Sequence, residues 1–199
     1  RPPALAGIEQ PLFVYVLTMK EHGPYRSDAP NRYSLVSDGL SDKAIGSLND
    51  YAERIADLDT ATEAFNQWLQ QRADGFQTAS GTDGLQKKRD YVFAYFGDHQ
   101  PNFEHFTPPI RTNYPHPDYL TQCAVRSSLP HTPAPRRLLD LALFGSVILE
   151  TAGLTPQDGL MHANTAIRRL TDGTLEDSPD QQLVNDYRDY LYRHLKITG

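Results

Sequence analysis

The sequence predicts an α/β fold, in which a sheet with flanking helices is followed by a helical tail. Two short apolar runs, at residues 11–19 and 91–96, are rich in Val, Phe and Tyr, as buried strands are. A long amphipathic pattern lies between them, and the order strand, helix, strand is typical of a parallel sheet. We therefore expect one structural unit over residues 1–199, with its core motifs in 10–105 and its helical tail in 130–199.

Composition excludes several classes of partner. The 199 residues carry a formal net charge of -6 and are 39% hydrophobic and 22% charged, which is ordinary for a soluble globular domain. Without a basic face, we expect no nucleic acid as a partner. No apolar run approaches the roughly 20 residues that span a bilayer, so we expect no membrane contact by this segment itself. The chain begins with Arg1 rather than Met, and we expect it to be a fragment of a longer protein.

The long helical pattern follows a polar loop at residues 20–40. Apolar side chains recur at steps of three and four from Ile45 to Leu69, and Ser41 precedes them as a candidate N-cap. A capping box at residues 60–63 would divide the pattern into two helices. The apolar stripe continues through that point without a change of phase, so we favour one long helix.

The second half of the chain predicts one more strand and then helices. A Pro-rich loop leads into an apolar stretch at 119–127, where we expect Cys123 to be a small core residue. Helical patterns with Pro, Ser and Gly at their ends follow. They cover residues 135–153, 156–170 and 178–196, the last with Ser178 as its expected N-cap.

Side chains suited to metal binding follow the predicted strands. Residues 20–22, which end in His22, come after the first strand, and Asp98 and His99 come after the second. Ligands bind outside the carboxyl ends of parallel strands, so these residues would face one crevice. A carboxylate and an imidazole are suitable ligands for zinc or manganese, and Gly97 permits a sharp turn before them. Two plainer readings stay open, in which Asp98 caps a turn and His22 is merely solvated.

Other catalytic chemistries lack their sequence patterns. There is no glycine-rich phosphate loop of the P-loop or dinucleotide type. There is no Gly-x-Ser-x-Gly turn for a serine hydrolase, and no motif that would make Cys123 a nucleophile.

Two motifs together resemble a known family. TMKEHGP at residues 18–24 and GDH at 97–99, each after a strand and separated by a long helix, are similar to the sulfatase domain of the alkaline-phosphatase superfamily. They resemble in particular the branch that contains lipoteichoic acid synthases, phosphoglycerol transferases and capsule-associated sulfatase-like proteins. The resemblance implies that this chain is the carboxy-terminal part of an alkaline-phosphatase-like sheet.

The resemblance also implies roles for individual residues. Asp98 and His99 would be two ligands of a divalent metal ion (Mn, Zn, Mg or Ca). His22 would bind the phosphate or sulfate oxygens of the substrate, and His105 would be a second substrate-binding histidine. Residues 25–26 would line the same pocket.

The function implied is a metal-dependent phosphoryl or sulfuryl transferase or hydrolase that acts on envelope glycolipid or polysaccharide esters. An attacking Thr, Ser or modified Cys and a further acidic ligand would lie in the amino-terminal half of the same protein. The nucleophile is therefore not present in this chain, and we expect the isolated fragment to have an incomplete metal site and to be inactive.

Partners and location follow from the same resemblance. The expected partners are a phosphate or sulfate ester substrate and the amino-terminal half of the protein, and an exposed sheet edge would also allow a homo-dimer. The parent protein would be membrane-anchored, with this domain on the extracytoplasmic face. Two alternatives remain, namely a non-catalytic binding domain on the same fold and an unrelated metal-free α/β module.

Overall fold

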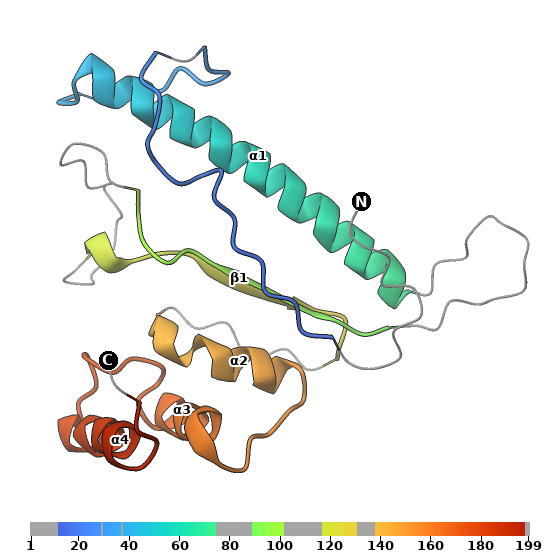
Figure 1. The fold of residues 1–199 in the computed structure, drawn as a ribbon, viewed down its shortest axis with the longest axis vertical. Coiled ribbons are helices and arrows are strands. Elements are labelled where there is room, and N and C mark those ends of the chain that lie inside the picture. Colours follow the sequence, from blue (N-terminus) through green and yellow to red (C-terminus); the bar gives the residue numbers. More distant parts are fainter. Residues whose placement is uncertain are drawn as a thin grey trace, which may run out of the picture. The chain divides into compact units, whose positions relative to one another are not determined.

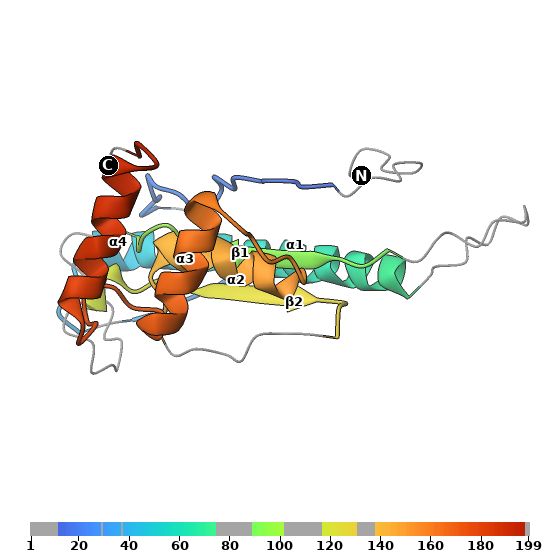
Figure 2. The same ribbon diagram turned by 90° about the horizontal axis from the view of Figure 1, so that it is seen from below.

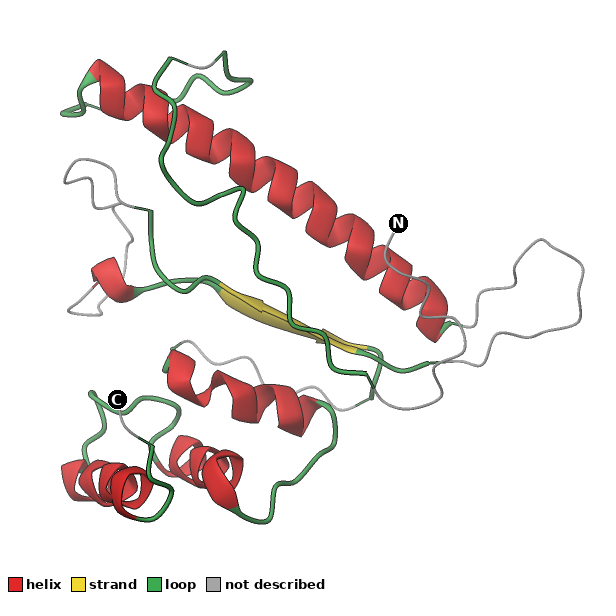
Figure 3. Cartoon of the chain, viewed as in Figure 1, coloured by secondary structure: helices red, strands yellow, loops and turns green. Residues whose placement is uncertain are grey.

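The computed structural model describes residues 12–28, 30–36, 38–74, 89–101, 117–130 and 138–197. Helices and a two-stranded sheet make up this part of the chain, which confirms the mixed α/β class (Figures 1 and 3). None of its helices is long and apolar enough to cross a membrane. The elements are α1 (Asp42–Ala73), β1 (Val92–Phe96), η1 (Pro117–Tyr119), β2 (Cys123–Ser127), η2 (Leu141–Leu143), α2 (Phe144–Thr151), α3 (Gly159–Leu170) and α4 (Gln181–Arg193).

The chain divides into two compact units. The first comprises residues 1–63 and 101–118, and the second comprises 64–100 and 119–199. The first unit therefore holds the loop with His22 and the amino-terminal part of α1, whereas the second holds the rest of α1, the sheet and the tail. The expectation of a single structural unit stays a prediction.

Helix α1 confirms the prediction of one long helix. It runs without interruption over Asp42–Ala73. The Ser41 hydroxyl accepts a hydrogen bond from the amide of Ala44 at 3.2 Å, which is the expected N-cap. Thr60 does not begin a second helix, because its hydroxyl donates to the Ala56 carbonyl one turn back at 2.8 Å.

The loop before α1 packs directly on the first part of that helix (Figure 1). The amide side chain of Asn49 accepts from the backbone N–H of Leu35 at 2.7 Å and donates to the Leu35 carbonyl at 3.4 Å. Gly46 allows the closest approach, because a Cβ there would lie 2.2 Å from the carbonyl oxygen of Ser27. The helix thus orders the loop through backbone contacts.

Substituting Gly46→Ala is expected to displace this loop and to destabilise the protein by about 1–3 kcal/mol, since the obstructing atoms belong to the backbone. Thermal melting measures the effect. Gly145→Ala in α2 is the matched control, because its Cβ would meet the flexible Met161 side chain at 3.4 Å. Alanine is also the better helix former, so the control should be neutral or stabilising. Equal melting temperatures for the two variants would contradict the prediction.

The prediction of a strand at 11–19 is wrong for the residues that the structure describes. Residues 12–19 are assigned to no strand, and their apolar side chains are exposed, with Phe13 84% and Val16 72% accessible. A strand needs a neighbouring strand to pair its backbone N–H and C=O groups. Within the described ranges the sheet is a pair of β1 and β2 alone, so the expected parallel β-α-β unit is not formed.

The other two predicted strands are confirmed and form an antiparallel pair. Ala94 of β1 lies opposite Val125 of β2, and Phe96 lies opposite Cys123. The centre of each strand is half-buried, but Cys123 at the start of β2 is exposed. The expectation of a buried cysteine is therefore wrong, because a sheet of two strands leaves some of its residues open to solvent. On the second part of α1, Phe65 packs edge-to-face on Phe93 with ring centroids 5.6 Å apart.

The helical tail is confirmed, with shorter helices than predicted (Figure 2). Helix α3 packs against both α2 and α4. Asp180 rather than Ser178 is the N-cap of α4, since its carboxylate accepts from the Leu183 amide at 3.0 Å. The Ser178 hydroxyl accepts from the Asp180 amide, so it shapes the turn before the helix instead. The fully buried apolar side chains here include Leu143 and Val184.

Buried polar contacts connect the tail helices. The Arg168 side chain is 2% exposed, donates to the Ser146 hydroxyl at 2.8 Å and pairs with Glu150. The Tyr187 hydroxyl donates to the Asn164 side chain at 2.7 Å, which ties α4 to α3. These contacts satisfy polar groups that would otherwise be costly to bury.

Candidate functional site

His22 lies in a tight turn that its own backbone and ring stabilise. Its amide donates to the Met19 carbonyl at 3.3 Å, and its Nδ1 is 2.8 Å from the Gly23 carbonyl oxygen. A carbonyl only accepts, so Nδ1 carries the proton in the neutral ring and Nε2 carries the lone pair. In the protonated ring, Nε2–H becomes a donor while Nδ1 keeps its contact.

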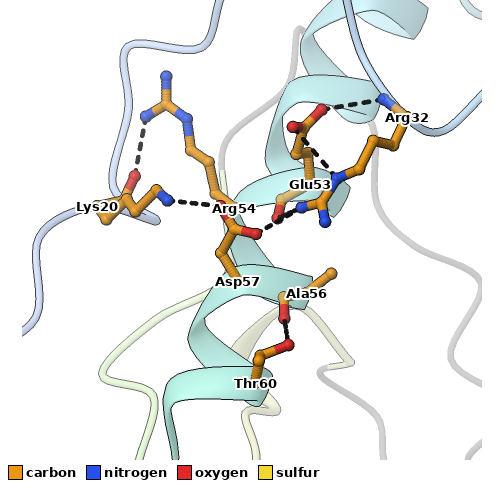
Figure 4. Close-up of polar contacts among 7 residues, drawn as sticks. All are labelled: Lys20, Arg32, Glu53, Arg54, Ala56, Asp57 and Thr60. Atoms are coloured by element: carbon orange, nitrogen blue, oxygen red, sulfur yellow. Dashed lines mark hydrogen bonds and ion pairs between the residues drawn. The ribbon is translucent and has the colours of Figure 1, made fainter.

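Three backbone carbonyl groups in the His22 turn accept hydrogen bonds from the side chain of Arg54, which belongs to α1. Its Nη1 donates to the carbonyls of Lys20 at 3.0 Å and of His22 at 2.9 Å, and its Nη2 donates to that of Pro24 at 3.3 Å. The Asp50 carboxylate pairs with Arg54 at 2.7 Å. Figure 4 shows the Lys20 contact, in which the guanidinium reaches from the helix to the loop.

A second, more exposed ion-pair group lies one turn further along α1 (Figure 4). The Asp57 carboxylate accepts from Lys20 and from Arg32, both at 2.5 Å, while Glu53 accepts from the Arg32 amide at 3.0 Å. The hydrogen bonds from Lys20 and Arg32 lower the pKa of Asp57 below its ordinary value. The Lys20 and Arg32 side chains are 64% and 57% exposed, so these pairs add little to stability.

Tyr25 and Arg26, which follow His22, make contacts that hold the loop on α1. Tyr25 packs edge-to-face on Tyr51, and its hydroxyl donates to the Glu21 carbonyl at 3.0 Å. Burial, and to a lesser degree Tyr51, raise the pKa of Tyr25, so the hydroxyl keeps its proton for that bond at neutral pH. The Arg26 amide donates to the Asp50 carboxylate at 2.8 Å. These contacts hold the loop, and whether residues 25–26 also line a substrate pocket stays a prediction.

Asp98 and His99 follow β1 directly. The Gly97 amide continues the ladder by donating to the Gln122 carbonyl at 2.9 Å. The side chains of Asp98 and His99 are 72% and 61% exposed, and the distance from Asp98 Oδ1 to His99 Nε2 is 3.8 Å. The His99 Nδ1 lies 2.8 Å from the Gln100 carbonyl oxygen. The backbone thus sets the tautomer in which Nε2 carries the lone pair, the atom that could bind a metal ion.

This pair fits part of a metal coordination shell. Two ligand atoms at ~2.0–2.1 Å from a tetrahedral ion lie about 3.3 Å apart, close to the 3.8 Å separation here. Asp98 Oδ1 also accepts from the His99 amide at 3.0 Å, so the turn-capping reading holds as well. Among the described residues no group of three or more His, Cys, Asp and Glu side chains forms a metal site. A metal ion held by this pair would therefore need further ligands.

The predicted site residues fall in separate parts of the structure. His22 belongs to the first unit, whereas Asp98 and His99 belong to the second. Their expected meeting in one crevice stays a prediction. His105 lies outside the described residues.

Sequence reasoning missed Asp50 and Arg54. Their signal was the spacing of four between opposite charges on a helix, which is also common on solvent-facing surfaces. Only the docking of the loop on α1 reveals that this pair binds the His22 turn.

Comparison with known proteins agrees with the motifs. The family model described as Sulfatase matches residues 5–129, a range that contains both TMKEHGP and GDH. An "Uncharacterized protein" of Haemophilus influenzae is 44% identical over 196 residues, which are 98% of this chain and 33% of that relative. The chain thus spans about a third of the length of the relative it matches. No solved structure matches it. By the extent of the family match, the chain belongs to the sulfatase family of the alkaline-phosphatase superfamily.

Proposed function

We propose that this chain supplies metal-binding and substrate-binding residues to a divalent-metal-dependent phosphoryl or sulfuryl transferase or hydrolase. The observation that carries the proposal is the Asp98–His99 pair at the end of β1, with a carboxylate oxygen and Nε2 3.8 Å apart in a sulfatase-family chain. A metal ion would use both of these atoms, whereas the turn alone uses only the Asp98 oxygen.

Asp98 and His99 would hold a Zn or Mn ion best, because these metals accept mixed oxygen and nitrogen ligands, and Mg or Ca are the further candidates. When bound, such an ion supplies charge stabilisation to the transferring group. The contact between His99 Nδ1 and the Gln100 carbonyl fixes the ring and makes Nε2 a better ligand. The remaining ligands would come from outside this chain.

His22 would bind the oxygens of the transferring group. In its protonated form, Nε2–H donates to an anionic phosphate or sulfate oxygen while Nδ1 stays on the Gly23 carbonyl. A donor held in place before the reaction stabilises developing charge without reorganisation. We propose His105 as a second donor of this kind.

The rest of the protein would complete the site. The extended segment at 12–19 exposes a row of apolar side chains, including Phe13 and Val16, as a strand without its neighbours does. We propose that the amino-terminal half pairs with this segment and brings the nucleophile, a Thr, a Ser or a modified Cys. By the likeness of the motifs to the lipoteichoic acid synthase branch, the substrates would be envelope glycolipid or polysaccharide esters. A membrane anchor would then hold the site on the extracytoplasmic face.

Metal removal tests the proposal. The complete protein is dialysed against a chelator and assayed with para-nitrophenyl phosphate and para-nitrophenyl sulfate. We expect turnover to be lost on chelation and restored by one of Mn, Zn, Mg or Ca, because the ion stabilises charge on the transferring group. The ester that is cleaved distinguishes a phosphotransferase from a sulfatase. Turnover that survives complete metal removal would refute the metal dependence, whereas no turnover together with no bound metal would favour a non-catalytic binding domain.

A further inference from the structure

We propose that Arg54 is a positioning residue that fixes the orientation of His22 by binding the backbone on both sides of it. The inference depends on the substrate-binding role proposed above for His22. Arg54 itself would touch no substrate and would act through the turn.

The geometry of the three hydrogen bonds carries the inference. The carbonyls of Lys20, His22 and Pro24 are alternate groups along the turn, and Arg54 donates to all of them within 3.3 Å. One of the three belongs to His22 itself, and the other two flank it. A shift of the turn away from Arg54 would lengthen all of these bonds, so together they hold the turn against the helix.

Arg54 is itself held from two sides. Its guanidinium pairs with Asp50 at 2.7 Å, and the side chains of the pair are only 19% and 12% exposed. Its Cζ lies 5.4 Å from the centroid of the Tyr25 ring, a cation–π distance. Asp50 also accepts a hydrogen bond from the Arg26 amide at 2.8 Å, so the Asp50–Arg54 pair binds the loop beyond Pro24 as well. The helix thereby holds the loop as one unit from residue 20 to 26.

The chemistry of the contact requires arginine. A guanidinium presents five donors in a planar fork and can serve three carbonyls and a carboxylate together. A lysine ammonium is a compact point charge with three donors, so it would keep the pair with Asp50 and lose the fork geometry. Hydrogen bonds from a charged group are stronger than neutral ones.

The ring of His22 follows its backbone. Because Nδ1 contacts the carbonyl of the next residue, Gly23, a change in the turn changes the direction of Nε2 as well. A misplacement of a binding group by 1 Å can reduce the rate by about 10²-fold. Arg54 therefore sets the accuracy with which His22 meets an anionic oxygen.

Hydrogen exchange of the complete protein tests whether Arg54 holds the turn. In Arg54→Lys, we expect the amides of residues 19–26, including those of His22 and Arg26, to exchange about 10-fold faster, because the turn opens more often. Exchange within α1 should stay the same. Arg72→Lys, also on α1 and stacked on Trp68 at 5.0 Å, is the matched control and should leave the turn unchanged. Equal exchange of the turn in wild type and Arg54→Lys, or an equal rise in the control, would overturn the proposal.

Kinetics of the same variants connect the turn to His22. With the para-nitrophenyl ester that is cleaved, Arg54→Lys should lower kcat/KM about 10–100-fold. Combined with His22→Ala it should cause no further loss, because both changes remove one function. Additive losses would show that Arg54 acts elsewhere and would refute the positioning role. If His22→Ala alone leaves turnover unchanged, the proposed function of His22 fails, and the exchange data still decide whether Arg54 holds the turn.

Discussion

Replacing His99 with alanine in the complete protein is expected to lower metal-dependent kcat/KM by about 10³-fold, because the variant removes one of the two metal ligands that we propose for this chain. Its Nε2 lies 3.8 Å from Asp98 Oδ1, and no nearby group that the structure describes completes a three-ligand cluster in its place. Bound metal, measured by mass spectrometry after dialysis, should fall with the activity. Asp98→Asn should behave in the same way, since an amide oxygen is a weaker ligand than a carboxylate.

His162→Ala is the matched control for this prediction. His162 is also exposed, and its Nδ1 lies 3.0 Å from the Pro156 carbonyl oxygen, so its ring makes the same kind of backbone contact as His99. It lies in the tail, beyond the residues 5–129 that match the family. The control should keep both its metal and its turnover. A His99→Ala variant that retains both would refute the assignment of His99 as a ligand.

The helices could be predicted because their signals are local. Ser41 has the side chain that an N-cap needs, and the apolar stripe from Ile45 to Leu69 fixes both the type and the length of α1. The N-cap of α4 was misplaced by two residues, because Ser178 and Asp180 are both good capping residues. Only the position of the Leu183 amide decides between them.

The sheet was harder to predict, because an apolar run indicates burial but does not show which other strand it pairs with. Residues 12–19 have the composition of a central strand, and the structure gives them no strand to pair with among the described residues. The run at 91–96 pairs with β2 and forms the expected strand. Two runs with the same composition thus differ in structure according to what lies beside them.

The place of a candidate residue in the fold was predictable where a motif follows a strand and not where a contact depends on docking. Asp98 and His99 follow a strand end, and their order in the chain was enough to propose them. Arg54 lies 32 residues from His22 in sequence, and nothing in an amphipathic pattern links it to that turn. Positioning residues of this kind become visible only when side chain and backbone are seen together.

Substituting Arg168→Ala is expected to cause the largest loss of stability in the tail, about 3–5 kcal/mol, because it breaks a buried ion pair and leaves a cavity. The Arg168 side chain is 2% exposed, donates to the Ser146 hydroxyl and pairs with Glu150, which is itself 26% exposed. Thermal melting should register the change as a fall of roughly 10 °C. Arg169→Ala is the matched control, since Arg169 contacts the same carboxylate at 3.0 Å but is 57% exposed, and it should cost at most about 1 kcal/mol.

The pH dependence of the same pair gives an independent check. Burial acts to raise the pKa of Glu150, but hydrogen bonds from Arg168 and Arg169 outweigh it, so the pKa lies below its ordinary value of 4.5. A carboxyl group with a lowered pKa stabilises the fold fully above its unfolded pKa, and this stabilisation is lost as the pH falls through the folded pKa. The wild type should therefore lose stability below about pH 4.5, and Arg168→Ala should lose less over the same interval because part of the contribution is already gone. If both proteins lose the same amount, or if Arg169→Ala is as damaging as Arg168→Ala, the burial of Arg168 is not what makes this pair important to the tail.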